Sequence, residues 1–579
     1  METLFSDIDL QDPAEYYGGF KEARTERWGE AERTLSHPFT GEWTGSTFDY
    51  QTADTDRAQR IALHNEPWRF KTPRCVRMVN RPHRAVLGTP WIVFIGHVVN
   101  AQPTGPMGFR YTLADRLSST IISDQHQIPW RLIRDGFLDQ LDEIAATLDF
   151  DQPEPILYGD HFRVPDVDPA SPQAFEIVPP YLGKRTITGT QYHVWLIAGH
   201  AVADIPRIAL DLVTTTEGSD WKIPHQAGHT ALVGASYEDL LSSTFGVMRR
   251  YTMLYGVVGN EAPDAVAAGD VSLTVAVSGV EPVGDGTGTV ISDRFLQYKH
   301  FVINFLAHGG EDSYQSGAWL TAPEWADPYD GPRTMVDETS FDECAEIGVI
   351  RLPDNPGYIG AAAIGARAGD RHGAPKYVAD WNRSCGCRFG VTQVGAMKVT
   401  LLHPTAAIKA AAPLYTDATE IALSSFSTDL GWTEHANLIP FRTDYEHVSG
   451  QWKTNDVSIH AVSVTAYGVT IPSAIREYPF APGITQSNHL AVLESRIRAH
   501  PIRIIGLEAE VGPDENGDSL AYRELGDYIR YRHFASVSDT IGEIRLAQVV
   551  AHQVQVGPRV VRIAAMDCED LIDFDEFEG

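Results

Sequence analysis

The sequence has little cysteine for its length. Its 579 residues include only five cysteines, Cys75, Cys344, Cys385, Cys387 and Cys568. A chain of this size held together by disulfides would carry more, and an odd number leaves one without a partner. The cysteines are therefore expected to be free thiols of a protein made in a reducing cytosol.

Basic residues are also scarce. The chain has 46 Lys and Arg against 77 Asp and Glu, which gives a net charge of −31. Such a surface repels duplex DNA and anionic lipid at long range. The composition therefore argues against a protein that grips nucleic acid, although nucleic acid can still slide past it.

Long apolar runs and targeting signals are missing. The most apolar run, Trp91 to Ile95, is far shorter than the ~20 residues that span a bilayer. The segment from Met1 to Asp7 lacks the basic and apolar stretches of a signal peptide. We therefore expect a soluble chain that is not exported through the Sec pathway.

The first incomplete metal pattern is a histidine pair. His225 and His229 have the spacing of a helical metal site, but Pro224 and Gly228 interrupt a helix there. Gln226 stands where the HExxH pattern has Glu. An ordinary pair of loop histidines is favoured.

The second incomplete pattern is Cys385-Gly386-Cys387, which could bind zinc or an iron–sulfur cluster together with Cys344 and His372. Structural zinc pairs have two or more intervening residues, and no second pair follows. Two strand cysteines, or a local redox pair, are therefore favoured over a metal site.

Phosphate-loop and nucleophile patterns also fail. The run Gly284 to Gly288 lacks the third glycine of GxGxxG, because Thr289 stands in its place, and no Lys-Ser/Thr follows. Ser236 lies in a nucleophile-elbow context, but Glu238 replaces the second glycine. A flexible loop and a helix cap are the favoured interpretations.

A calcium loop is incomplete as well. Asp514, Asn516 and Asp518 are spaced like EF-hand ligands, but Leu525 stands where the twelfth position requires Glu. No catalytic, cofactor-binding or metal-binding residue is therefore predicted, and the chain is predicted not to be an enzyme.

Strand signals dominate the pattern. Trp91 to Val99 forms a buried-strand run broken by Gly96, and residues 389–401 alternate around a turn at Gly395. Arg545 to Val556 and Arg559 to Ala565 flank a second turn. Asn516-Gly517 is a hairpin signal.

One alternating run changes phase. Val457, Ile459 and Ala461 alternate with polar residues, and the phase then slips by one at Val462, which predicts a bulge or a strand that changes face. With 49 Gly and 35 Pro, the chain is expected to be a β-dominated, multi-domain protein with few helices.

Three helices are predicted. Arg131 to Leu148 and Ser236 to Met248 place apolar residues at three- and four-residue spacing. A third helix is expected to begin at Ser340, because Ser340 and Glu343 form a capping-box pattern.

Several segments follow one another in an order that is typical of one family. They are Val93–Val99, Phe109–Leu117, Ile177–Gly183, Tyr192–Val194, Asp285–Thr289, Asp337–Ile347, Gly386–Gly390, Gly395–Met397, Glu524–Arg530 and Val560–Ile563. Together they resemble the baseplate or tail-tip hub proteins of tailed bacteriophages, both contractile-tail and siphophage. The first two match a Phe-x-Gly-x-Val strand and a strand ending in Asp-x-Leu. The region from Pro153 to Thr289 is longer than in the plain family pattern.

This resemblance implies a mainly β fold with some α (α+β). It would contain two tail-tube-like β-barrel domains with inserted or additional smaller α+β domains. The implied function is that of a structural hub at the tail tip or baseplate. Three copies would form a ring that continues the tail tube, and genomic DNA would pass through the lumen without specific binding.

The resemblance also implies partners and a location. A homotrimer would contact the tail tube protein, the tape measure protein, the distal tail protein and tail fibre or spike proteins. The chain would lie in the virion after assembly in the host cytoplasm, with no cofactor. Acidic residues facing a lumen would repel DNA phosphates within a Debye length of ~8 Å.

The expected organisation has six parts. They are an N-terminal arm (1–40), a first tube-like β-barrel region with a helix (41–150), an inserted β-rich domain (151–290), an α+β hub domain (291–405), a second tube-like β-barrel region (406–566) and an acidic tail (567–579).

Two alternatives stay open. The inserted region could carry a carbohydrate-active enzyme domain or a glycan-binding module that uses exposed Trp and Tyr. The tail, with seven acids in thirteen residues, is either a solvating segment or a docking peptide. In the second case its apolar anchors would be Leu571, Ile572, Phe574 and Phe577.

Overall fold

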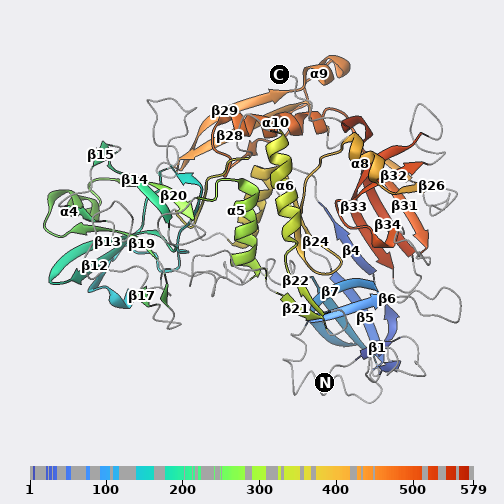
Figure 1. Ribbon diagram of the computed structural model, residues 1–579, viewed down its shortest axis with the longest axis horizontal. Coiled ribbons are helices and arrows are strands. Elements are labelled where there is room, and N and C mark those ends of the chain that lie inside the picture. Colours follow the sequence, from blue (N-terminus) through green and yellow to red (C-terminus); the bar gives the residue numbers. More distant parts are fainter. Residues whose placement is uncertain are drawn as a thin grey trace.

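Figure 1 shows a computed structural model of the chain in which several β-sheets surround a central group of helices. The structure describes residues 4–6, 21–23, 25–28, 30–35, 47–53, 73–78, 91–104, 108–115, 133, 138–161, 176–200, 202–211, 213–215, 220–222, 240–241, 248–249, 251–280, 290–307, 322, 324–327, 331–351, 358–366, 373–416, 427–431, 435–446, 450–510, 520–532, 543–555 and 560–572.

The first sheet is antiparallel and comes from the N-terminal part of the chain. Its strand order is β3-β5-β8-β7-β6. The strands are β3 (Thr25–Trp28), β5 (Thr47–Ala53), β6 (Pro73–Met78), β7 (Trp91–Thr104) and β8 (Gly108–Ala114).

The second sheet has seven strands and comes mostly from the C-terminal part. Its order is β26-β32-β33-β34-β31-β27, and β4 also pairs with β33. The strands are β4 (Glu30–Thr34), β26 (Leu414–Thr416), β27 (Ser427–Gly431), β31 (Ile502–Glu510), β32 (Tyr528–Arg532), β33 (Arg545–Gln555) and β34 (Val560–Asp567).

These two sheets share one hydrophobic core. Phe48 and Phe109 of the first sheet are buried in the same cluster as Leu507, Val549 and Ile563 of the second. The chain passes directly from β3 to β4, so the N-terminal segment contributes a strand to each sheet. Figure 1 shows β4, in blue, lying beside the red and orange strands of the second sheet.

A buried polar cluster fixes β4 on β33. Arg33 donates from Nη1 to Glu524 Oε2 (3.1 Å), and its Nη2 lies 2.9 Å from His552 Nδ1. His552 Nε2 lies 3.2 Å from the carbonyl oxygen of Leu520. The buried guanidinium therefore has both charged and neutral partners, as burial of a charge requires.

The middle of the chain forms two further sheets, drawn in green and teal in Figure 1, with orders β16-β19-β13-β12-β9 and β11-β20-β14-β15. Their strands and the adjoining helix are β9 (Glu143–Ile144), β11 (Asp160–His161), β12 (Tyr181–Ile187), β13 (Thr190–Ala198), β14 (Val202–Leu210), β15 (Val213–Thr215), β16 (Trp221–Lys222), β19 (Thr252–Val257), β20 (Leu273–Val280) and α4 (Glu261–Ala268). Trp195, Leu254 and Val275 are buried between them in one core.

The central helices carry the largest core. They are α5 (Arg294–Phe301), which continues as a π-helix (Val302–Ala307), α6 (Glu338–Arg351), α7 (Ala374–Cys385) and α10 (Ile484–Ile497). Two hairpins adjoin them, β24 (Arg388–Val391) with β25 (Met397–Thr400), and β28 (Leu438–Glu446) with β29 (Gln451–Ile459). Tyr298, Trp381 and Phe480 are buried among these elements.

The remaining elements are short. They are β1 (Leu4–Ser6), β2 (Lys21–Ala23), η3 (Leu138–Gln140), β10 (Ile156–Tyr158), β17 (Leu240–Leu241), β18 (Met248–Arg249), β21 (Glu324–Asp327), β22 (Gly331–Thr334), β23 (Ala362–Ile364), α8 (Ala406–Ala411), α9 (Ala461–Tyr467), β30 (Arg476–Glu477), η8 (Leu520–Tyr522) and η9 (Glu569–Leu571). Among the described residues, no helix is both long and apolar enough to cross a membrane.

The mainly β fold class with some α is confirmed. The strand predicted at Trp91 to Val99 is present as part of β7, and the hairpins around Gly395 and between β33 and β34 are present too. Gly395 has a φ of 81°, a conformation that glycine adopts without strain.

Two of the predicted helices do not form in the described residues of their segments, which contain short strands instead. Within residues 138–148 lie η3 and β9, because this segment bonds to β12 as the edge of the sheet: Ala145 N donates to the Leu182 carbonyl (2.9 Å). In the segment from Ser236 to Met248, β17 pairs with β18, with Leu241 opposite Met248, and residues 236–239 and 242–247 lie outside the described residues.

Two boundary predictions are corrected. The third helix exists, but it begins at Glu338, and Ser340 Oγ donates to the Asp337 carbonyl (2.7 Å) within its first turn. The phase slip at Val462 marks the start of α9 instead of a bulge. His460 caps this helix, since its Nδ1 accepts from Ser463 N (3.2 Å).

Candidate functional site

The candidate cysteines are buried thiols. Cys344, Cys385 and Cys387 lie in the central core, and Cys387 Sγ donates to Asn382 Oδ1 at 3.7 Å. Burial raises the pKa of the Cys344 and Cys387 thiols, whereas a metal binds the thiolate. No group of three His, Cys, Asp or Glu side chains that could hold a metal occurs within the described part of the chain.

Other sequence candidates lie outside the described residues. These are His225, His229, His372, Ser236, the run Gly284 to Gly288, and the triplet Asp514, Asn516 and Asp518, together with the turn Asn516-Gly517.

A Tyr–His–Asp chain in the middle sheets was not singled out as a site from the sequence. His193 Nδ1 lies 2.7 Å from the Tyr181 hydroxyl, and its Nε2 lies 2.9 Å from Asp264 Oδ1. Burial raises the pKa of Tyr181 to about 12, so the phenol donates to His193. Asp264 also accepts from Gly259 N (3.0 Å). The hydrogen bonds from Tyr181 through His193 to Asp264 therefore fix α4 on β12 and β13.

The tryptophans of region 151–290 are structural. Trp195 and Trp221 are both buried, and their rings lie 5.3 Å apart between centroids. Their position explains why the two middle sheets adhere, since aromatic side chains bury large apolar areas. Neither tryptophan offers a ring to an external sugar.

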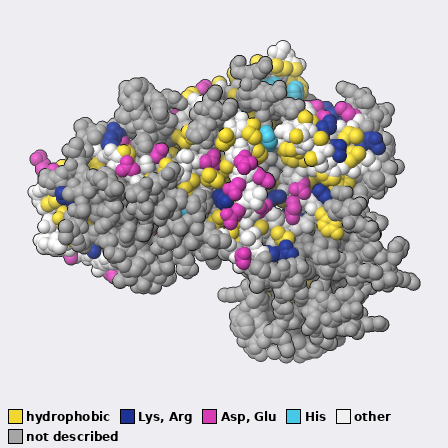
Figure 2. Space-filling view, in the orientation of Figure 1, with side chains coloured by type: hydrophobic (Ala, Val, Ile, Leu, Met, Phe, Trp, Pro, Cys, Tyr) yellow, Lys and Arg dark blue, Asp and Glu magenta, His cyan; other side chains and the backbone are white. Residues whose placement is uncertain are grey.

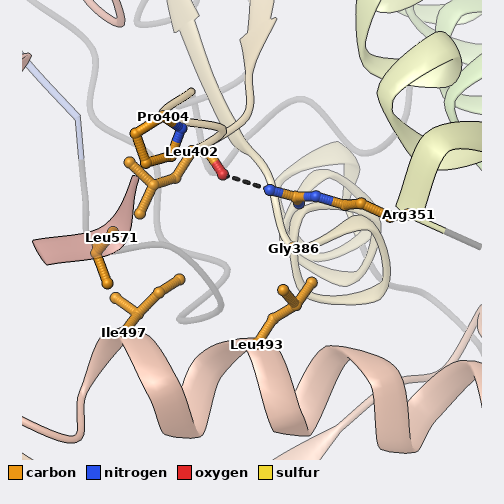
Figure 3. Close-up of a pocket in the computed structure, with 7 residues that line it drawn as sticks. All are labelled: Arg351, Gly386, Leu402, Pro404, Leu493, Ile497 and Leu571. Atoms are coloured by element: carbon orange, nitrogen blue, oxygen red, sulfur yellow. Dashed lines mark hydrogen bonds between the residues drawn. The ribbon is translucent and has the colours of Figure 1, made fainter. Parts of the chain in front are cut away.

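A narrow crevice lies among the central elements. Figure 3 shows Leu493 and Ile497 of α10 on one side and Arg351 and Leu402 opposite, with Arg351 Nη2 donating to the Leu402 carbonyl at 2.6 Å. Its volume is about 10 Å³, which is room for about one water molecule. The crevice cannot admit a substrate.

One surface of the described residues is apolar and exposed. It lies on β29, α9 and the segment that follows, and we call it the apolar crest. Its six side chains are between 38% and 70% exposed: Val457, Ile459, Val462, Tyr467, Val469 and Ile475. Figure 2 shows hydrophobic side chains gathered at this upper end of the molecule, around α9. Contiguous exposed apolar surface of this kind marks interaction sites.

The crest arises because the apolar residues at the end of β29 face outward. Ser458 points inward and donates to Ser495 Oγ of α10 (3.4 Å), whereas Val457 and Ile459 on either side of it are exposed. A strand that covers a core normally shows the opposite pattern, with apolar residues inward. The sequence alternation revealed the strand but not the face that it presents.

A buried ion cluster holds the crest from below. Glu494 of α10 is fully buried and accepts from Arg476 Nη2 (2.6 Å) and Arg498 Nη1 (2.8 Å). Arg476 belongs to β30, which pairs with β28. The hairpin is therefore fixed on α10, and the exposure of its outer face is a stable feature.

A groove of about 620 Å³ adjoins the crest. We call it the crest groove. Its lining is mixed in charge and includes two arginines, two aspartates and two histidines: Arg496, Arg503, Asp567, Asp570, His460 and His500. Burial, with the nearby charges of His500 and Arg496, lowers the pKa of His460.

Comparisons with known proteins give structural likenesses only. No protein-family model matches the chain, and no curated protein matches its sequence. The 43 kDa tail protein of prophage MuSo2 from Shewanella oneidensis is 6% identical, with 93% of this chain and 94% of that one covered and a TM-score of 0.34.

Two other solved structures are similar to the chain. The tail protein of Neisseria meningitidis MC58 is 8% identical, with 95% of each chain covered and a TM-score of 0.31. A chain of a native gene transfer agent virion is 9% identical, with 74% of this chain and 87% of that one covered and a TM-score of 0.39. Identities and TM-scores are low in all three cases.

Proposed function

We propose that the chain is a structural protein of a bacteriophage tail, and more specifically the hub of a tail tip or baseplate. Three copies form a ring that continues the tail tube and joins it to the distal tail, tape measure and fibre or spike proteins. DNA passes through the lumen. The chain acts by assembly and carries out no chemical reaction.

The apolar crest carries this proposal. Val457, Ile459 and Val462 are exposed although the hairpin beneath them is fixed by the buried Glu494 cluster. A permanent assembly buries such side chains in large apolar interfaces. An assembly protein therefore accounts for the crest better than a protein that works as a single chain.

The two sheets that share a core support the proposal that the chain is a tail hub. Strands from residues 47–114, with β3, form one sheet and strands from residues 414–567 form most of the other, and side chains of both sheets meet in one cluster. In the proposed ring each sheet forms part of one tube-like wall. Three chains with two walls each would then match a six-fold tube.

The charge of the chain fits a conduit. The net charge of −31 lets acidic side chains face a lumen, where they repel phosphates and keep DNA from adhering. The ordered sequence resemblances to hub proteins agree with this arrangement.

The decisive experiment is the mass and shape of the purified particle. Light scattering should give about three times the chain mass of 63.8 kDa, and electron microscopy should show a three-fold ring with a central hole. The protein should also bind rings of a tail tube protein. A compact monomer at all concentrations, without affinity for tube rings, contradicts the proposal.

A further inference from the structure

Histidines contact both ends of α9, which Figure 1 shows at the upper edge of the molecule. His460 precedes the helix and caps it, and Tyr467 is the last residue of the helix. The Tyr467 ring lies 4.7 Å from the His435 ring and 6.0 Å from the His500 ring, between centroids. The rings of His460 and His500 lie 6.4 Å apart. Because histidine changes its charge between about pH 5 and 8, the attachment of α9 is a place where pH can act.

The bond at the first end of α9 requires a neutral imidazole. Ser463 N donates to His460 Nδ1 at 3.2 Å. An imidazolium has two N–H donors and no acceptor, so a proton on Nδ1 removes this bond. The positive ring would then face backbone N–H groups of the first helical turn, which are donors as well. Protonation of His460 therefore turns the cap from an attraction into a repulsion.

The buried side of α9 is attached at Ala499. Ser463 Oγ donates to the Ala499 carbonyl at 2.6 Å, and the His435 ring also bonds to the Ala499 backbone. His435 is buried and touches Tyr467, so a positive charge on its ring loses hydration while α9 is attached. When α9 leaves, water reaches the ring and that cost disappears.

Burial disfavours protons on both rings. Burial lowers the pKa of His460 from an ordinary value of 6.5, and the charges of His500 and Arg496 add to this. Burial also lowers the pKa of His435, against the opposing effect of its bond to the Ala499 backbone. With both pKa values lowered, the attached helix binds fewer protons than the released one. Release is therefore favoured progressively as pH falls below about 6.5.

The carboxylates near the cluster are already bonded to arginines. Asp567 Oδ2 and Asp570 Oδ1 line the crest groove and accept from Arg545 at 2.7 and 3.3 Å. Glu494 accepts from Arg498 at 2.8 Å, and α9 itself has no acidic residue. The charged and titratable groups around the two histidines, within the described residues, are Arg496, Arg498, His500, Arg503, Asp567 and Asp570. A protonated histidine here would share carboxylates that arginines already hold.

We propose that proton uptake by His435 and His460 releases α9 from the turn between α10 and β31. At neutral pH both rings are uncharged, and the cap bond and the contacts of Tyr467 hold the helix in place. Near pH 5 the helix leaves, and Val462 no longer contributes to the crest. This inference goes beyond the proposed function, because it concerns one chain and does not depend on the ring.

The test is hydrogen exchange of the full chain at about pH 7.5 and about pH 5. The protection factor, which is the intrinsic exchange rate divided by the observed rate, removes the ordinary effect of pH on exchange. It is measured at Val464 and Gly468, whose amides bond to the carbonyls of His460 (3.1 Å) and Val464 (2.8 Å). Both protection factors should be at least about tenfold lower at pH 5, because the released helix binds more protons.

Matched variants assign the effect to the two histidines. His435→Gln with His460→Asn keeps hydrogen-bonding groups that do not titrate, since Asn caps helices well. In this double variant the protection factors of α9 should differ less than about twofold between the two pH values. His489→Gln is the control and should keep the full response, because His489 lies on α10, bonds to Tyr358 (3.1 Å) and does not line the crest groove.

Three outcomes overturn the proposal. They are equal protection of α9 at both pH values in the natural chain, a response that persists in the double variant, and a response that is lost equally in His489→Gln. Light scattering is recorded alongside, and exchange is compared at a concentration where the mass is the same at both pH values. A ring without the response at α9 contradicts only this inference, whereas a monomer with the response contradicts only the proposed function.

Should the double variant fail to fold, a fluorine label on the helix gives the answer. Val462 is 70% exposed, so Val462→Cys can be labelled with a trifluoromethyl group, and the natural chain treated in the same way identifies signals from other thiols. The fluorine resonance of the label should narrow at about pH 5, because the released helix moves more freely. The same line width at both pH values contradicts release.

Discussion

Two antiparallel hairpins of this chain differ in where their apolar residues lie: one buries them and the other exposes them. In the β33–β34 hairpin, Val549, Val561 and Ile563 face the core between the two large sheets and are buried. In the β28–β29 hairpin, Val457 and Ile459 face outward and are exposed, while Ser458 points inward.

This difference shows that alternation of apolar and polar residues along a strand can serve either the core of the monomer or an outer surface. In β34 it supplies a core that holds the monomer together. In β29 the buried residue between Val457 and Ile459 is Ser458, which bonds to Ser495 of α10, so the two apolar side chains are available for another surface. The two hairpins should therefore respond differently to the same substitutions.

The largest effect is expected beneath the exposed hairpin. Glu494→Ala leaves Arg476 and Arg498 buried without their carboxylate. Removing one partner of a buried ion cluster typically costs about 3–5 kcal/mol, and we expect that loss in the free energy of unfolding. Urea titration measures it.

The control for this prediction is an exposed ion pair. Glu143→Ala removes the partner of Lys184 at the edge of the middle sheets, where the carboxylate is largely exposed. Its cost should stay within about 1 kcal/mol. Equal losses for the two substitutions would mean that the Glu494 cluster does not fix the hairpin.

The next effect compares the same substitution in both hairpins. Ile563→Ala removes a buried side chain and should cost about 2–5 kcal/mol, whereas Ile459→Ala should cost below about 1 kcal/mol. Thermal or urea unfolding gives both values. Similar costs would show that the crest is packed within the monomer and would remove the basis for an assembly surface.

Local signals explain which elements the sequence predicts. The hairpin at Gly395 and the β33–β34 hairpin are marked by alternation on both sides of a turn residue, and each forms from one continuous stretch of the chain. The strand β7 is similarly marked by its own apolar run. Such elements need no information from distant parts of the chain.

Long-range contacts explain why the helix predicted from Arg131 to Leu148 does not form. Leu138 and Leu148 have helical spacing and are indeed buried, but the backbone at Ala145 bonds to β12, about forty residues later. The spacing of apolar residues is the same for a helix and for this irregular edge segment. The sheet edge decides the outcome, and the local sequence does not contain it.

The sequence predicted one strand of the candidate site but not which of its faces is exposed. Val457 and Ile459 marked a strand, but the face that they present depends on α10, where Ser495 receives the Ser458 hydroxyl. The crest groove joins Arg503 and His460, which are distant in sequence and come together through the fold. Neither surface has a motif of its own.

A third effect concerns pH and the two-sheet core. Burial, with the charge of Arg33, lowers the pKa of His552 to about 3, from an ordinary value of 6.5. Below pH 6.5 the unfolded chain takes up a proton that the folded chain refuses, so stability falls as pH falls toward 3. At about pH 5 the loss is about 2 kcal/mol for this histidine.

Two variants separate this histidine from the others. His552→Gln keeps an acceptor for Arg33 and a donor for the Leu520 carbonyl, so it should reduce the pH dependence of urea unfolding between about pH 7 and 5. His500→Gln, at an exposed position in the crest groove, serves as the control. An unchanged slope in His552→Gln would show that His552 is protonated equally in both states.

The smallest effect is expected at the cap of the crest helix. His460 Nδ1 accepts from Ser463 N, and α9 ends at Gly468 after only seven residues. His460→Ala removes this bond and should cost about 1 kcal/mol, whereas His460→Asn should keep most of it because Asn caps helices well. Hydrogen exchange should therefore accelerate at the α9 amides in the Ala variant, with the amides of β33 unchanged. Because α9 carries Val462, fraying of this helix would disorder part of the crest without unfolding the core. Equal acceleration in the Ala and Asn variants would show that the cap does not hold the crest.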